Sequence, residues 1–107
     1  MDKVPDRIKE QILQFFYTLK EEKVSVTDAY LFGSYSKGTA DNDSDIDIAL
    51  ISELFTGDRM KDREIIRKSV IHSSPLIEII PFAVSDFTDE NPLAREIRHN
   101  GIRLSEI

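Results

Sequence analysis

Two strand-like segments joined through a turn of small residues place the strongest constraint on how this chain folds. Residues 24–32 are rich in β-branched and aromatic side chains and run directly into Gly33-Ser34, which predicts a strand that ends at a turn. Residues 45–51 begin with alternating acidic and aliphatic side chains and then become wholly apolar, as expected for a strand that enters a core. With a third apolar segment at 76–82, these segments predict a small central sheet.

Helical patterns fill the intervals between the predicted strands. Residues 5–23 carry apolar side chains at helical spacing among charged ones, which predicts an amphipathic first helix. Residues 58–70 predict a second surface helix, on which three arginines share one face: Arg59, Arg63 and Arg67. Asn91 before Pro92 is typical of a helix start, and Gly101 of a helix end. With a short helical turn after the first strand, the predicted order is α-β-α-β-α-β-α, an α/β fold.

Composition limits the class of protein. At 107 residues, 40% of them hydrophobic, the chain is long enough for one core and too short for two ordinary domains, so residues 1–107 are expected to form a single domain. A net charge of -6 argues against a broad basic surface that grips long nucleic acid. The absence of cysteine excludes disulfides and thiolate metal sites. The N-terminal segment lacks the apolar core of a signal peptide and no apolar run has membrane-spanning length, so a cytoplasmic location is expected.

Asp45 and Asp47 form the centre of an acidic cluster. Residues two apart in a strand project from the same face, so these carboxylates are expected to converge while Ile46 faces the other way. Asp41 and Asp43 add negative charge, and no basic residue lies between positions 38 and 58. Because like charges repel, a bound cation is the simplest remedy. Carboxylates without histidine or cysteine are typical ligands of Mg²⁺ or Mn²⁺, and two such ions can hold the attacking and leaving oxygens of an in-line displacement.

Glu78 and the Gly33-Ser34 turn extend this cluster into a predicted site for phosphoryl or nucleotidyl transfer. Glu78 interrupts an apolar segment, where a free carboxylate would be costly to bury, so it is expected to face the same metals from an adjacent strand. There it would hold the metal that activates an acceptor hydroxyl, or accept the proton of that hydroxyl. Gly33 has no Cβ and lets a phosphate approach the backbone, while Ser34 is expected to cap the helical turn and donate to phosphate oxygens. Lys37 is expected to add a positive charge for the same phosphates.

Other interpretations compete with this one. A solvated acidic loop explains the aspartates alone, and an ion pair with an arginine of the 58–70 helix explains Glu78. An EF-hand loop is excluded because its sixth position, counted from Asp41, is Ile46 in place of glycine. A P-loop is excluded because Thr39 stands where the motif requires lysine.

The strand that ends at Gly33-Ser34, followed after ten residues by Asp-Ile-Asp at 45–47, resembles the minimal nucleotidyltransferases of the DNA polymerase beta superfamily. The segment 91–104 also resembles that family's last helix and tail, so the resemblance covers nearly the whole chain. It implies a polymerase-beta-like α/β fold with a small mixed sheet flanked by helices. It further implies bound ATP, two Mg²⁺ ions, and transfer of AMP with release of pyrophosphate.

Position by position, the resemblance assigns a role to each residue of the predicted site. Gly33 and Ser34 would bind the triphosphate, and Asp45 and Asp47 would hold the metals. Glu78 would take the place of a third acid, which is often aspartate in the family, and its extra methylene could shift the second metal.

The resemblance also implies a partner. Family members this small are typically encoded beside a helical HEPN-type protein, and such pairs resemble toxin-antitoxin modules in which the nucleotidyltransferase is the antitoxin. The implied acceptor is a tyrosine hydroxyl of the HEPN-type toxin. Two alternatives stay open: a binding antitoxin that neutralises its partner by contact, and an enzyme that transfers a nucleotide to a small hydroxyl compound. The sequence leaves open the nucleobase, the oligomeric state and the presence of a partner gene.

Overall fold

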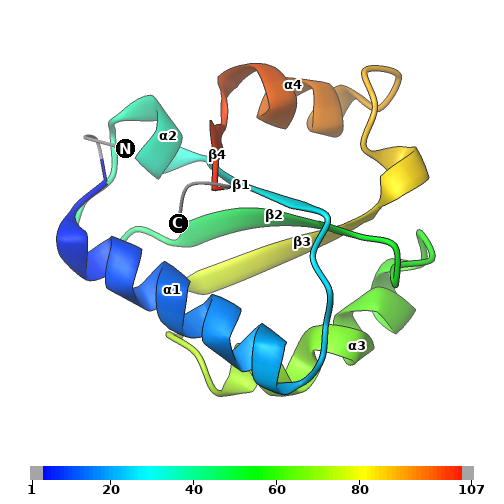
Figure 1. The fold of residues 1–107 in the computed structure, drawn as a ribbon. Coiled ribbons are helices and arrows are strands. Elements are labelled where there is room, and N and C mark those ends of the chain that lie inside the picture. The colour runs from blue at the N-terminus through cyan, green and yellow to red at the C-terminus, as the bar shows by residue number, and fades with distance from the viewer. Residues whose placement is uncertain (1–3, 105–107) are drawn as a thin grey trace.

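Helices cover both faces of a four-stranded sheet in the computed structural model, which describes residues 4–104 (Figure 1). Residues 1–3, the start of the N-terminal segment considered above, lie outside this range. The elements in chain order are α1 (Asp6–Glu21), β1 (Asp28–Phe32), α2 (Ser34–Lys37), β2 (Ile46–Ser52), α3 (Arg59–Ile71), β3 (Ile77–Ala83), the 3-10 turn η1 (Val84–Asp86), α4 (Pro92–Asn100) and β4 (Ile102–Arg103). The strands lie in the order β3-β2-β1-β4; β1 is antiparallel to both neighbours, and β2 is parallel to β3. The predicted α/β fold with a mixed sheet is confirmed.

Each face of the sheet has its own hydrophobic cluster. Helices α1 and α3 lie on one face and α4 on the other (Figure 1). On β2, Ile46 and Ile48 join the cluster that contains α1 and α3 side chains, whereas Ala49 and Ile51 join the cluster that contains α4 side chains. This division follows from the alternation of side chains along a strand. It also fixes which way Asp47 points, because Asp47 lies on the opposite face from Ile46.

The first helix is held by the side chains that its periodicity predicted. Ile8, Ile12, Phe15 and Leu19 are all at most 1% exposed and pack in the same cluster. Removing side chains of this size from water stabilises the fold by about 1.5–3 kcal/mol each. Helix α1 therefore anchors one face of the sheet.

The first strand begins four residues later than its composition predicted. Lys23 has a left-handed φ of 59° and the backbone N–H of Val24 donates to the carbonyl oxygen of Leu19 at 2.9 Å, which closes α1 with a turn. Val24 then packs in the core from a loop, and pairing starts only at Asp28. A β-branched composition does not distinguish a packed loop from a paired strand.

The last helix begins and ends where the sequence predicted. The Asn91 side chain accepts hydrogen bonds from the backbone N–H groups of two residues in the first turn, which confirms the predicted cap. Gly101 ends the helix with an extended φ of -78° rather than a left-handed one. Glycine is needed there because a Cβ would lie 2.5 Å from the Ile97 carbonyl oxygen and 3.1 Å from that of Leu31. The close approach leads directly into β4, a two-residue strand that the sequence did not predict.

A buried carboxylate fixes the connection between β2 and α3. Asp62 is 0% exposed and accepts three hydrogen bonds, from the Thr56 N–H at 2.8 Å, the Thr56 hydroxyl at 3.1 Å and the Gly57 N–H at 3.0 Å. Hydrogen bonds from several donors offset the cost of burying a charge. Asp62 thus holds the loop that leads from β2 into α3.

Candidate active site

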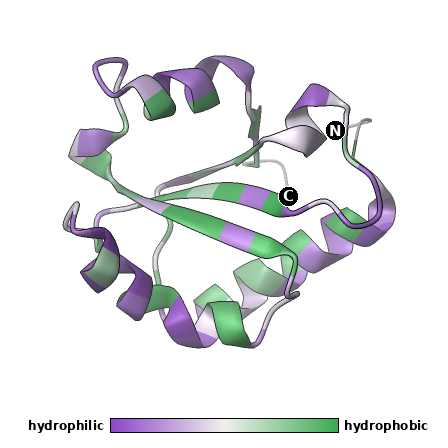
Figure 2. Ribbon diagram, turned by 180° about the vertical axis from the view of Figure 1, so that it is seen from behind, coloured by the Kyte–Doolittle hydropathy of each residue, from purple (hydrophilic) through white to green (hydrophobic). Residues whose placement is uncertain are grey.

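Three strands bring the predicted site residues to one end of the sheet. Because β1 is antiparallel to β2 and β3 is parallel to it, the end of β1 meets the starts of β2 and β3. In the sheet, Phe32 lies opposite Asp47, and Asp47 lies beside Glu78. Figure 2 shows one hydrophilic stretch in each of the otherwise hydrophobic strands β2 and β3, at neighbouring positions. Residues 47 and 78 are far apart in sequence and adjacent in the fold.

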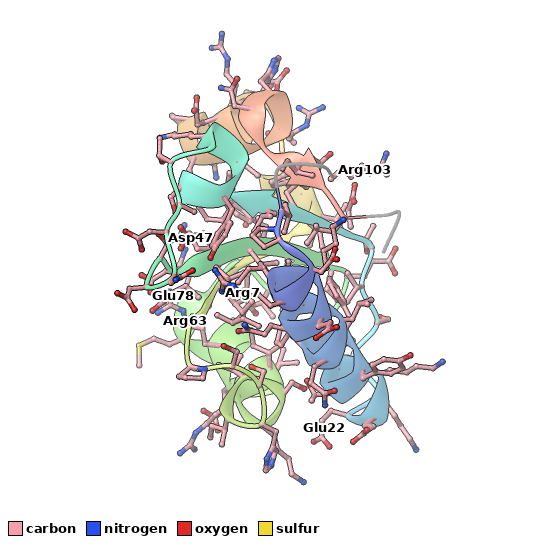
Figure 3. All side chains as sticks on the ribbon, turned by 90° about the vertical axis from the view of Figure 1, so that its left-hand side faces the viewer. Arg7, Glu22, Asp47, Arg63, Glu78 and Arg103 are labelled. Carbon is pink, nitrogen blue, oxygen red and sulfur yellow. The ribbon has the colours of Figure 1, made fainter. Side chains whose placement is uncertain are left out.

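The three acids of the predicted site act on one another. Asp47 is half-buried, whereas Asp45, which immediately precedes β2, and Glu78 are exposed. The pKa of Asp47 is raised above its ordinary value of 3.8, first by partial burial and then by the negative charges of Asp45 and Glu78. Figure 3 shows Asp47 and Glu78 on the same side of the molecule. A cation at this end of the sheet would relieve the repulsion.

Glu78 is not buried, contrary to the environment that its apolar neighbours suggested. Ile77 and Ile79 are buried on the face of the sheet that α1 and α3 cover, whereas the side chain of Glu78 between them is exposed. The reason is that β3 is an edge strand and the site lies at its start, where no helix covers this face. No ion pair joins Glu78 to an arginine among residues 4–104, although Arg63 and Glu78 line the same groove. Its availability to a ligand therefore comes from exposure rather than from an unpaired buried charge.

The Gly33-Ser34 turn lies against Asp47. Gly33 has φ 71° and ψ -144°, a conformation that residues with a side chain rarely adopt, and a Cβ at this position would overlap the Asp47 carboxylate. Ser34 is half-buried and is the first residue of α2 rather than its cap, and its side chain makes no capping hydrogen bond. The predicted cap is therefore wrong, because Gly33 occupies that position. Lys37 lies one turn further on, exposed at the end of α2.

The carboxylates of Asp45, Asp47 and Glu78 are chemically suited to Mg²⁺, although their oxygens do not converge on one point in this structure. Within the described range 4–104, no three acidic or histidine side chains lie close enough together to hold a metal ion. Asp45 and Glu78 are exposed, and their negative charges add to partial burial in raising the pKa of Asp47. Carboxylate oxygens are the ligands that Mg²⁺ prefers in proteins. The residues therefore fit a divalent cation that draws the carboxylates together.

Two polar residues beside the site were not predicted as part of it. Arg7, in the first turn of α1, donates from Nη2 to the Asn42 side-chain oxygen at 2.6 Å. This contact ties α1 to the loop that carries the acidic cluster, and Figure 3 shows Arg7 on the side of the molecule where Asp47 and Glu78 lie. A lone arginine on a charged helix face gives no sequence signal for such a role.

The family to which this domain belongs follows from comparison with known proteins. Residues 9–98 match the family described as the nucleotidyltransferase domain, a range that contains every residue of the predicted site. The chain belongs to the nucleotidyltransferase family. The family resemblance inferred from the sequence is thus confirmed at the level of the nucleotidyltransferase domain, which supports a nucleotidyl transfer activity in general.

The fold of this nucleotidyltransferase is similar to one known from crystallography. The crystal structure of a candidate nucleotidyltransferase from Sulfolobus solfataricus superimposes with a TM-score of 0.60 at 15% sequence identity. The match covers 96% of this chain and 89% of that one. At this identity the likeness shows a shared fold alone. No curated protein matches the sequence.

Proposed function

We propose that this nucleotidyltransferase transfers AMP from Mg-ATP to a hydroxyl group of a protein partner. One observation carries the proposal: Asp47 and Glu78 are neighbours across β2 and β3, with Asp45 close enough to raise the pKa of Asp47 and with Gly33 against its carboxylate. The carboxylates can bind a metal ion, and the glycine turn at the same end of the sheet leaves room for a phosphate. Membership in the family supports the reaction class, and the nucleotide, the metal and the acceptor are the proposed part.

Each residue of the site has a distinct role in this proposal. Gly33 leaves room for the triphosphate to approach the backbone, and Ser34 donates a hydrogen bond to it. Mg²⁺ ions held by Asp45, Asp47 and Glu78 would neutralise phosphate charge and lower the pKa of the acceptor hydroxyl. Glu78 orients that hydroxyl and receives its proton while the oxygen bonds to the α-phosphorus and pyrophosphate leaves.

The proposed acceptor is a tyrosine of a HEPN-type protein, and the proposed setting is the cytoplasm. Support for the partner comes from the resemblance described above. No helix within residues 4–104 is long and apolar enough to cross a membrane. The second candidate function is neutralisation of the partner by contact alone.

Transfer of labelled AMP separates the two functions. The purified domain is incubated with Mg²⁺, ATP labelled at the α-phosphate, and the HEPN-type protein encoded nearest to it. Label and an added AMP mass on a tyrosine of that protein are expected. Glu78→Gln is expected to keep Mg-ATP binding, measured as a rise in melting temperature, and to slow transfer by about 10²-fold or more, because glutamine keeps the shape without the charge.

The matched control is Glu10→Gln, which removes one exposed carboxylate from α1 at a distance from the site residues in sequence and on another element. It is expected to transfer AMP at the wild-type rate. Full transfer by Glu78→Gln would remove Glu78 from the site. A partner that is neutralised by the wild-type chain but never gains AMP would favour contact alone.

A further inference from the structure

A groove runs between α3 and the open edge of the sheet, next to the candidate active site. Its volume is about 400 Å³, and Glu78 is one of its lining residues. Strand β3 is the outermost strand on this side, so one long edge of it pairs with no other strand of the described chain. Its lining includes the apolar side chains of Met60 and Ile71 and four charged ones: Arg63, Glu64, Arg67 and Glu78.

The backbone of β3 presents unpaired hydrogen-bonding groups along this groove. The Ile46 N–H donates to the Leu76 carbonyl oxygen at 2.7 Å, so even-numbered residues of β3 turn their backbone groups toward β2. Odd-numbered residues turn theirs outward. Within the described chain, the outward N–H of Ile79 and the carbonyl oxygens of Ile77 and Ile79 have no partner, because β3 pairs with β2 alone. Such an edge is a template for an added strand.

Proline limits the length of this template. Pro81 occupies the next outward position, where it has no N–H to donate. Proline is found at outward positions of edge strands, because there it interrupts no hydrogen bond of the sheet. The open stretch is therefore centred on Ile77 to Ile79, with the exposed Glu78 side chain between them.

The side chains of the groove indicate what kind of segment it accepts. Met60 is 85% exposed and Ile71 is 63% exposed, so apolar surface is available at both ends of α3. Arg63 and Arg67 lie one turn apart on the groove wall, although the chain as a whole has a net charge of -6. Arg67 is 3.6 Å from the Glu64 carboxylate, and Arg63 makes no ion pair among residues 4–104. Glu64 offsets the charge of Arg67, so among residues 4–104 the charge that the α3 wall leaves unpaired is that of Arg63, and an apolar segment that carries an acidic side chain complements it.

We propose that the groove docks an extended acidic segment of the protein acceptor as an added strand on β3. Backbone pairing at Ile77 to Ile79 gives affinity, and the arginines of α3 select acidic side chains. A strand added at this place runs directly beside Glu78, which brings a hydroxyl of the segment to the candidate active site. The inference rests on the proposed function in one respect, namely that the docked segment carries the acceptor hydroxyl.

Two other occupants fit the surface less well. A second copy of the chain, paired edge to edge through β3, would bring the arginines of both α3 helices to the same seam, and like charges there oppose association. A nucleic acid would pair its phosphates with Arg63 and Arg67 but would leave the backbone donors and acceptors of β3 unused. The unpaired edge therefore favours a peptide.

Binding of a defined peptide in the absence of nucleotide tests the proposal. The probe is a labelled heptapeptide with a central tyrosine, an aspartate on each side of it and valine elsewhere, followed by fluorescence polarisation. The wild-type chain is expected to bind it and to discriminate against the same peptide with lysine in place of aspartate. Arg63→Glu with Arg67→Glu is expected to weaken binding by about tenfold or more, since two attractive pairs become repulsive. Arg95→Glu, an exposed arginine on α4, is the matched control and is expected to bind as the wild type does.

Hydrogen exchange distinguishes strand addition from a merely electrostatic contact. On peptide binding, exchange of the Ile79 amide is expected to slow by about tenfold or more, and a peptide N-methylated at alternate residues is expected not to bind. If the double charge reversal unfolds the protein, Arg63→Gln with Arg67→Gln removes the positive charges without adding negative ones, and weaker peptide binding by this variant tests the same contribution. Wild-type protein that ignores the peptide, or that binds it without protecting Ile79, would overturn the proposal.

The other occupants give outcomes of their own. A dimer seen by light scattering that protects the Ile79 amide without peptide would assign the edge to self-association. Binding of oligoadenylate RNA that is lost on reversal of the arginines, with no peptide binding, would assign it to nucleic acid. Because these measurements use no ATP, they stand apart from the proposed function. AMP transfer without peptide docking would remove the docking surface alone, and peptide docking without AMP transfer would remove the enzymatic function alone.

Discussion

Replacing Asp47 by asparagine is expected to make the metal-free protein more stable while it destroys the candidate site. The carboxylate of Asp47 is half-buried, stands against Gly33, and is repelled by Asp45 and Glu78. No hydrogen bond to this carboxylate is found among the described residues to offset these costs. Asparagine keeps the shape and removes the charge, so the repulsion disappears.

The magnitude follows from how exposed the group is. Full burial of an unpaired carboxylate would cost several kcal/mol, but solvent reaches Asp47 and screens its neighbours. We therefore expect a gain of about 0.5–1 kcal/mol in the free energy of unfolding of Asp47→Asn. For a domain of this size the gain corresponds to a rise in melting temperature of about 2–8 °C.

The dependence on pH has a defined sign. Because the folded-state pKa of Asp47 is raised, the folded protein binds a proton more readily than the unfolded chain. The ionised group destabilises the fold at neutral pH, and this penalty fades as the pH falls through the raised pKa toward the ordinary value of 3.8. The stability difference between variant and wild type should therefore be largest at neutral pH and vanish in acid.

Thermal and urea unfolding in the presence of EDTA, at several pH values, measure this difference. Glu10→Gln is the control, since it changes the net charge by the same amount on an exposed face of α1. Saturating Mg-ATP should reverse the order, because only the wild type gains stability from a bound ligand. If Asp47→Asn is less stable than the wild type without metal, or gains no more than Glu10→Gln, the repulsion is not what governs this site.

Three further substitutions test features of the fold around the site. Gly33→Ala is expected to lower the free energy of unfolding, measured in urea, by about 2–4 kcal/mol, because of the backbone conformation at this position and the overlap of the new Cβ with Asp47. The control is Gly38→Ala, where φ is 76° and the space around the Cβ is open, and its free energy of unfolding should fall by only about 1–2 kcal/mol. Equal losses in the two variants would argue against the overlap. Asp62→Ala is expected to cost about 3 kcal/mol, because it leaves three donors without their acceptor, and a loss below about 1 kcal/mol would show that water replaces it. Gly101→Ala is expected to lower the melting temperature by about 5 °C or more, since its Cβ meets two carbonyl oxygens, and an unchanged melting temperature would show that the end of α4 yields freely.

The elements that the sequence predicted correctly are those in which the spacing of apolar residues follows directly from which side of the element is buried. The spacing of Ile8, Ile12, Phe15 and Leu19 is set by the face that α1 turns to the sheet, so burial and periodicity carry the same information. The aliphatic run that follows Asp47 is likewise a record of a strand covered on both faces. Such patterns can be recognised in the sequence without knowing which elements pack against them.

The features that the sequence did not predict depend on partners distant in the chain. Strand β4 is only two residues long, too short for any periodicity, and exists because Gly101 brings the chain against Leu31. Asp62 looks like one more surface charge of a helix, and only the loop folded over it makes it a buried acceptor. The exposure of Glu78 depends on β3 lying at the edge of the sheet, which is a property of strand order rather than of the residues around it.

The edge position of β3 links the candidate chemistry to the proposed docking surface. If β3 were a central strand, a further strand would pair with the backbone groups of Ile77 and Ile79, and an acceptor segment could not add there. At the edge, Glu78 lies beside Asp47 in the register of β2 and β3, while the outward backbone groups of Ile77 and Ile79 pair with no other strand. Binding of the acceptor and its activation then use adjacent residues of a single strand. A substitution that blocks the outward edge, such as Ile79→Pro, should consequently abolish docking while leaving Mg-ATP binding at Gly33 and Asp47 intact, provided that circular dichroism shows a folded domain.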